Sequence, residues 1–132
     1  MANKLILVPI DLASPFRKPF ETAVELASDL GASIELLYVE PTPMNKLPEH
    51  LRASLQEKLE AFAGDPGVPV TPKLRVGNPA NEIVSWARTA EATMIVMGTH
   101  NRTGLARAII GSIAEAVLRD SAIPVVVVPG EK

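Results

Sequence analysis

Hydrophobic residues in this chain gather in short runs separated by longer stretches of mixed polarity; four runs are apolar at most positions, and Val70–Val76 alternates more openly. The runs are Leu5–Ile10, Ser33–Val39, Val70–Val76, Thr93–Met97 and Pro124–Val128. A short run that is apolar on both faces is typical of a parallel strand buried within a sheet. The pattern therefore predicts five strands, of which the third is the most open to solvent.

The stretches between these runs place apolar residues along one face of a helix. The predicted helices contain the stripes Phe20–Leu30, Leu51–Phe62, Ile83–Ala90 and Ile113–Asp120. Gly31 and Gly64 supply stops after the first two helices. Asn78 and Pro79 open the third as an N-cap residue followed by proline at the first helical position.

Strict alternation of strand and helix predicts a three-layer α/β sandwich, with helices on both faces of a parallel sheet and right-handed crossovers. Pro72 lacks an N–H for the sheet ladder, which places the third strand at an edge. The Rossmann-like strand order 3-2-1-4-5 meets this condition, and its topological switch point lies between strands one and four. Ligands of such sheets bind there, beyond the carboxyl ends of the strands, so function is expected just after Ile10 and Met97.

Composition narrows the class of protein. A chain of 132 residues with 47% hydrophobic residues is expected to form one domain, residues 1–132, with a real core. The absence of cysteine excludes disulfides, thiolate nucleophiles and cysteine-bound metals. A net charge of −2 argues against a nucleic-acid surface. With neither a membrane-spanning run nor a signal peptide in the sequence, a soluble, cytoplasmic protein is expected.

The connection after the fourth strand is unusually long. Gly98–Gly111 covers 14 residues, against the roughly 2–6 of an ordinary connection of this kind. It combines residues that permit close backbone approach with hydroxyl and basic side chains. These are Gly98, Thr99, Asn101, Arg102, Thr103, Gly104, Arg107, Gly111 and Ser112. Followed by the free amides of a helix start, such a segment can form a phosphate cradle.

Two interpretations of this segment remain open. Ser112 and Glu115 have the spacing of a capping box, which predicts a helix beginning at Ser112 with the serine side chain as its cap. Leu105, Ile109 and Ile113 also share one helical face, so a single helix could instead cover Leu105–Asp120 with Gly111 inside it. A glycine in mid-helix costs up to about 1 kcal/mol relative to alanine.

The segment Gly98–Ser112 resembles the signature of the universal stress protein family, with Asn101 in place of the middle glycine. The resemblance extends to Val8–Asp11, Gly77–Pro79 and Ser121–Val128. It implies the same 3-2-1-4-5 sheet and, for one subgroup of the family, ATP bound at the switch point.

By this resemblance Asp11 and Val39 would flank the adenine or ribose of ATP, AMP or ADP. The residues expected to line the phosphates are Gly98, His100, Asn101, Gly111, Ser112 and Ile113. Pro9, Ile10, Met97 and Arg102 complete the predicted nucleotide site. Magnesium, if present, would come with the phosphates and need few protein ligands. The resulting hypothesis is an ATP-binding stress-response or signalling protein.

Two further hypotheses remain. Asn101, and the sequence Asp11–Ala13 where the family has Asp-Gly-Ser, favour a nucleotide-free interaction module. An enzyme of adenylyl or phosphoryl transfer would need a substrate pocket that so short a chain can hardly supply.

Asp11, His100 and Ser112 have the residue types of a hydrolytic triad, but the sequence has no G-x-S-x-G elbow. No catalytic residue is predicted, and ATP hydrolysis is expected to be very slow at most. Asp11 has a structural alternative as an acid at a helix N-terminus.

The last predicted strand bears on assembly. Val125, Val126, Val127 and Val128 form an apolar edge strand that no lysine or glutamate protects. Such an edge favours pairing with another chain. The family resemblance implies a homodimer in which two copies pair antiparallel through this strand about a two-fold axis.

Overall fold

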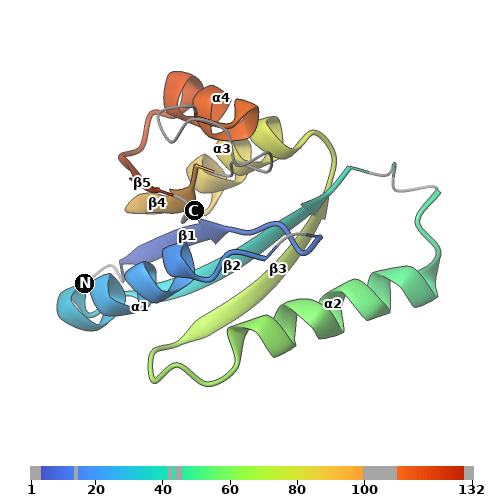
Figure 1. Cartoon of the computed structure of the whole chain (residues 1–132), viewed down its shortest axis with the longest axis horizontal. Helices are drawn as coiled ribbons and strands as arrows, with labels where there is room; N and C mark the ends of the chain where they lie inside the picture. The colour runs from blue at the N-terminus through green and yellow to red at the C-terminus, as the bar shows by residue number, and fades with distance from the viewer. Residues whose placement is uncertain (1–3, 14, 42, 44–45, 100–109, 130–132) are drawn as a thin grey trace.

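The structure is a computed structural model that describes residues 4–13, 15–41, 43, 46–99 and 110–129. Strands and helices alternate along these residues, as the hydrophobic pattern predicts (Figure 1). The strands are β1 (Leu5–Pro9), β2 (Ser33–Glu40), β3 (Val70–Val76), β4 (Met94–Gly98) and β5 (Val125–Val128). The helices are α1 (Lys18–Leu30), α2 (Glu49–Ala63), α3 (Pro79–Thr89) and α4 (Ser112–Asp120).

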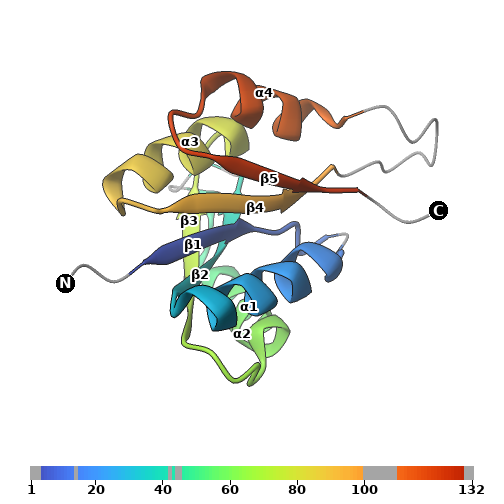
Figure 2. The same ribbon diagram turned by 90° about the vertical axis from the view of Figure 1, so that its left-hand side faces the viewer.

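The strands form one parallel sheet of order β3-β2-β1-β4-β5, which confirms the predicted topology. Pro72 lies in the edge strand β3 opposite Leu36, so its missing N–H interrupts no ladder in the middle of the sheet. Figure 2 shows α1 and α2 on one face of the sheet and α3 and α4 on the other. The predicted three-layer arrangement is therefore confirmed.

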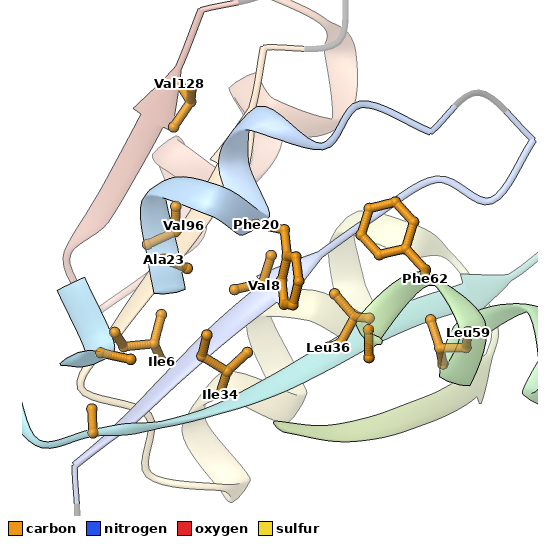
Figure 3. Packing of buried hydrophobic residues seen from close by; sticks show 13 residues of the cluster. Ile6, Val8, Phe20, Ala23, Ile34, Leu36, Leu59, Phe62, Val96 and Val128 are labelled. Atoms are coloured by element: carbon orange, nitrogen blue, oxygen red, sulfur yellow. The ribbon is translucent and has the colours of Figure 1, made fainter. Parts of the chain in front are cut away.

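Each face of the sheet has its own hydrophobic core, because alternate residues of a strand point to opposite faces. Ile6 and Val8 of β1 pack beneath α1 and α2, whereas Leu7 packs against α3 and α4. Figure 3 shows the first core, in which the rings of Phe20 and Phe62 lie with their centroids 5.6 Å apart. This contact joins α1 to α2.

The predicted ends of α1 and α3 are confirmed. Gly31 ends α1 in the left-handed conformation, with φ of 68°, which glycine adopts without a steric penalty. Asn78 caps α3, since its Oδ1 accepts a hydrogen bond from the Asn81 N–H at 3.0 Å, and Pro79 follows as the first helical residue. This cap sets the point at which α3 begins beside the carboxyl edge of the sheet.

The start of α4 differs from its prediction in two ways. The helix begins at Ser112 as expected, but its N-cap is Gly111, which has no side chain to accept hydrogen bonds. Ser112 is already helical and cannot serve as the cap, so the predicted capping box is wrong. Gly111 is extended, with ψ of 158°, so the alternative of one continuous helix through this glycine is also wrong. Residues 105–109 lie outside the described part of the chain.

The buried face of α4 also differs from the predicted stripe. Val117 of the predicted stripe is buried, as is Ala114, whereas the predicted Ile113 is 37% exposed and the predicted Ala116 lies at an intermediate position. The helix is thus rotated by about one residue from the predicted face, and its first turn reaches the carboxyl edge of the sheet.

Candidate functional site

A cavity of about 330 Å³ lies at the carboxyl ends of the central strands. Its lining comes from β1, β2 and β4, from the segments that follow β1 and β2, and from the first turns of α1, α3 and α4. The lining residues are Pro9, Ile10, Asp11, Ala13, Phe16, Pro19, Leu37, Tyr38, Val39, Pro41, Pro79, Ile83, Met97, Gly98, Ile113 and Ala114. Most are apolar, and the cavity includes the β1/β4 switch point to which the topology points.

The predicted site residues fall into three groups. Those that line the cavity are Pro9, Ile10, Asp11, Val39, Met97, Gly98 and Ile113. Gly111 and Ser112 directly precede Ile113 but are not part of the lining. His100, Asn101 and Arg102 lie outside the described residues. Nucleotide binding by any of them remains a prediction.

Several lining residues were not predicted from the sequence. Tyr38 and Pro41 lie at the carboxyl end of β2, and Pro79 is the first residue of α3. Because all strands are parallel, each strand end and each following helix start meets at one edge. Applying this rule to β2 and β3 would have predicted Tyr38, Pro41 and Pro79 as lining residues. Phe16 depends on the path of the chain between β1 and α1, for which the sequence carries no signal.

Asp11 stands at the cavity just past β1. Its Oδ1 accepts a hydrogen bond from the Ala13 N–H at 2.9 Å, and the Ile10 N–H donates to the Leu37 carbonyl at 2.8 Å. The first bond closes a local turn that orients the carboxylate. α1 begins only at Lys18, so the alternative of Asp11 as a helix N-terminal acid is wrong. Its carboxylate can accept hydrogen bonds from a hydroxyl or amino group of a ligand.

Tyr38 supplies a ring and a phenol to the same cavity. Its hydroxyl donates to Glu40 Oε1 at 3.1 Å. Burial raises the pKa of Tyr38 to about 12, and the hydrogen bond to Glu40 and the negative charges of Glu40 and Asp11 add to this effect. The phenol is therefore a neutral group at physiological pH.

The titration of Tyr38 can be measured directly because it is the only tyrosine of the chain. Ultraviolet absorbance of the tyrosinate is expected to report a pKa of about 12 in the folded protein and about 10 in urea. Because the folded pKa is the higher one, this stabilisation is complete below pH 10 and is lost as the pH rises toward 12. Glu40→Gln should lower the folded pKa, and an unchanged value would contradict the assigned hydrogen bond.

The first turn of α4 brings backbone amides to the cavity. Ile113 and Ala114 line it, and the N-cap Gly111 offers no side chain to accept hydrogen bonds from the helix start. Amides of a first helical turn lack acceptors within the helix, and the helix dipole makes this end positive. The helix start is suited to an anion, and apolar lining residues such as Val39 and Ile83 are suited to an apolar group.

Both ends of the long Gly98–Gly111 segment are tied to the sheet. The Thr99 N–H donates to the Val128 carbonyl at 3.1 Å, and the Thr99 carbonyl accepts from the Gly111 N–H at 2.9 Å. Thr99 is itself buried. These bonds fix where the segment leaves β4 and where it rejoins α4.

The described residues hold no cluster of three or more His, Cys, Asp or Glu side chains placed to bind a metal ion. Across the same residues, no helix combines the length and the apolar character needed to cross a membrane.

Comparison with known proteins identifies the family. The profile of the universal stress protein family matches residues 2–129. This chain belongs to that family. Universal stress protein MJ0531 of Methanocaldococcus jannaschii is 34% identical over 142 residues, an alignment that covers 98% of this chain and 84% of the relative. The resemblance of the Gly98–Ser112 signature is thereby confirmed.

Solved structures of this family share the fold. Protein MJ0577 of the same organism has a TM-score of 0.76 and 28% identity, with 100% of this chain and 99% of that one covered. A universal stress protein from Archaeoglobus fulgidus, solved in complex with dAMP, has a TM-score of 0.77 and 22% identity. The alignment covers 96% of this chain and 98% of the A. fulgidus chain, and at this identity the likeness concerns the fold alone.

Proposed function

We propose that this protein binds an adenine nucleotide, ATP or its AMP or ADP forms, and acts in stress response or signalling. The observation that carries the proposal is a cavity whose mostly apolar lining includes the first turn of α4, where the N-cap Gly111 offers no side chain to the helix start. A solved relative of the same fold holds dAMP, which supports this ligand class. The nucleotide would occupy the β1/β4 switch point.

The lining residues fit the parts of a nucleotide. Val39, Pro41 and Ile83 offer an apolar pocket for the base, and Asp11 offers an acceptor for a ribose hydroxyl or the adenine amino group. The first-turn amides of α4 would face a phosphate. Magnesium would be held chiefly by the phosphates themselves, since the described residues supply no acidic or histidine cluster for it.

Thermal unfolding with added nucleotide tests this proposal. A ligand present at 100 times its Kd stabilises the fold by about 2.7 kcal/mol, so the Tm should rise by several degrees with ATP or AMP. GTP should have little effect. Guanine carries a carbonyl at the position where adenine carries an amino group that can donate a hydrogen bond to a carboxylate. Nucleotide extracted from the purified protein should have the mass of an adenine nucleotide. The absence of both a shift at millimolar concentration and an extracted nucleotide would overturn the proposal.

The nucleotide-free interaction module remains the second candidate. Ala13 lines the cavity where a serine of the family's usual sequence would offer a hydroxyl, and this favours the alternative. A sharp gain of ATP affinity in Asn101→Gly, starting from none, would assign the native protein to this class.

We further propose that the protein works as a homodimer and by binding rather than catalysis. β5 is an edge strand built only of valines, and Val125, Val126 and Val127 are partly exposed. Pairing of this edge with a second copy would bury them. ATP hydrolysis is expected to be very slow at most, and a cytoplasmic location remains an expectation.

A further inference from the structure

Two of the described residues that line the cavity have polar side chains, Asp11 and Tyr38. The other described lining residues are apolar, apart from Gly98, which has no side chain. Asp11 and Tyr38 follow neighbouring points of β1 and β2, because the Ile10 N–H donates to the Leu37 carbonyl at 2.8 Å and holds the two strand ends together. Polar recognition by these lining side chains therefore depends on this pair.

The hydroxyl proton of Tyr38 is already engaged. The hydroxyl lies 3.1 Å from Oε1 of Glu40, two residues further along β2 and on the same face of the strand. A carboxylate can only accept a hydrogen bond, so the phenol is the donor. Burial above all, then the hydrogen bond to Glu40 and the charges of Glu40 and Asp11, raises the pKa of Tyr38 to about 12, so the phenol keeps this proton at physiological pH.

This arrangement leaves the phenol oxygen as an acceptor. A hydroxyl that donates its one proton to a carboxylate still has a lone pair for a second group. The carboxylate of Asp11 is also an acceptor. A ligand group that meets Tyr38 and Asp11 in the cavity must therefore be a donor.

Two acceptors distinguish between purine bases. Adenine carries a 6-amino group, which donates, whereas hypoxanthine carries a 6-oxo group, which needs a donor. A carbonyl placed against Asp11 and Tyr38 would lose its hydrogen bonds to water and gain none in exchange. The pair therefore favours the 6-amino base.

We propose that Glu40 is a positioning residue that sets base selectivity: by holding the Tyr38 proton it keeps the phenol oxygen an acceptor, so the site binds AMP in preference to inosine monophosphate (IMP). This inference rests on the proposed nucleotide function and deepens it. Glu40 is not one of the residues that line the cavity, so it acts through Tyr38. The selectivity concerns the base alone and leaves phosphate binding unchanged.

Calorimetric titration of the full chain with AMP and with IMP tests the assignment, since the two nucleotides share the ribose and phosphate. Wild-type protein should bind AMP about tenfold more tightly, the effect of one hydrogen bond made in one complex and lost in the other. In Glu40→Gln the amide can donate to the phenol oxygen, which frees the phenol proton for the cavity. IMP should then bind more tightly, and the AMP preference should fall several-fold. Tyr38→Phe should lower the preference by weakening AMP instead.

Glu35→Gln is the matched control. It makes the same substitution in the same strand, in a carboxylate that also accepts from an aromatic side chain, the indole N–H of Trp86. That pair lies on the opposite face of the sheet from Tyr38, so the AMP preference should stay that of the wild type. A purely structural role of Glu40 would weaken both nucleotides alike, whereas tighter binding of IMP follows only from release of the Tyr38 proton.

The outcomes separate the two claims. An unchanged AMP preference in Glu40→Gln, or in Tyr38→Phe should the glutamine variant not fold, overturns the role of Glu40 and leaves the proposed function standing. A wild type that binds IMP as tightly as AMP also overturns it. Binding of neither nucleotide to the wild type or to any variant overturns the proposed function and this inference with it.

Discussion

Val127→Lys is expected to convert a dimer of this chain into a monomer at micromolar concentration. Val127 is partly exposed in the edge strand β5 and, unlike Val125, Val126 and Val128, contributes to neither of the two cores. A lysine there can keep its charge in water in the monomer. In a dimer paired through β5, two such lysines would meet near the two-fold axis, and pairing would strip both of water.

Sedimentation equilibrium measures this effect. The wild type should have twice the chain mass of 14.1 kDa and Val127→Lys the mass of one chain. Thr71→Lys is the matched control, because Thr71 is exposed in β3 at the opposite edge of the sheet. It adds the same charge and should remain dimeric. A wild type that sediments as a monomer would show that β5 does not pair between copies.

The topology was predictable because few residues decide it. Runs apolar on both faces require a sheet covered on both sides, and Pro72 is tolerated only at an edge. Asn78 and Pro79 then mark where α3 begins, which brings that helix start to the same sheet edge as Ile10 and Met97. The strand order 3-2-1-4-5 satisfies all of these conditions and has the right-handed crossovers that parallel sheets require.

The errors arose where tertiary packing overrides a local pattern. Ser112 and Glu115 have the spacing of a capping box, yet Gly111 takes the cap position because its N–H is bonded to Thr99 and its backbone is extended. The position of Phe16 against Gly98 could not be predicted either, since it depends on the path of the chain between β1 and α1. Neither contact has a short-range sequence pattern.

Gly111→Asp is expected to stabilise α4 while it removes nucleotide binding. Aspartate is a preferred N-cap residue, and the φ of −61° and ψ of 158° at Gly111 suit any side chain. Its carboxylate would bond the first-turn amides and complement the helix dipole, for a gain of about 0.3–1 kcal/mol. The same amides are those proposed to face the phosphate, so the carboxylate would take the place of the ligand.

Repulsion adds to this loss of donors. Two unit charges at about 8 Å repel by roughly 2 kcal/mol at an effective dielectric constant of about 20, which corresponds to about a 30-fold loss of affinity. Gly111→Asn is the matched control, because asparagine caps the helix equally well and carries no charge. Thermal unfolding should show the Asp variant at least as stable as the wild type without ligand, but with no rise in Tm on addition of AMP. The Asn variant should keep only part of that rise, because its side chain occupies the same amides but adds no repulsion. A rise as large as that of the wild type in both variants would mean that the anion binds away from the start of α4.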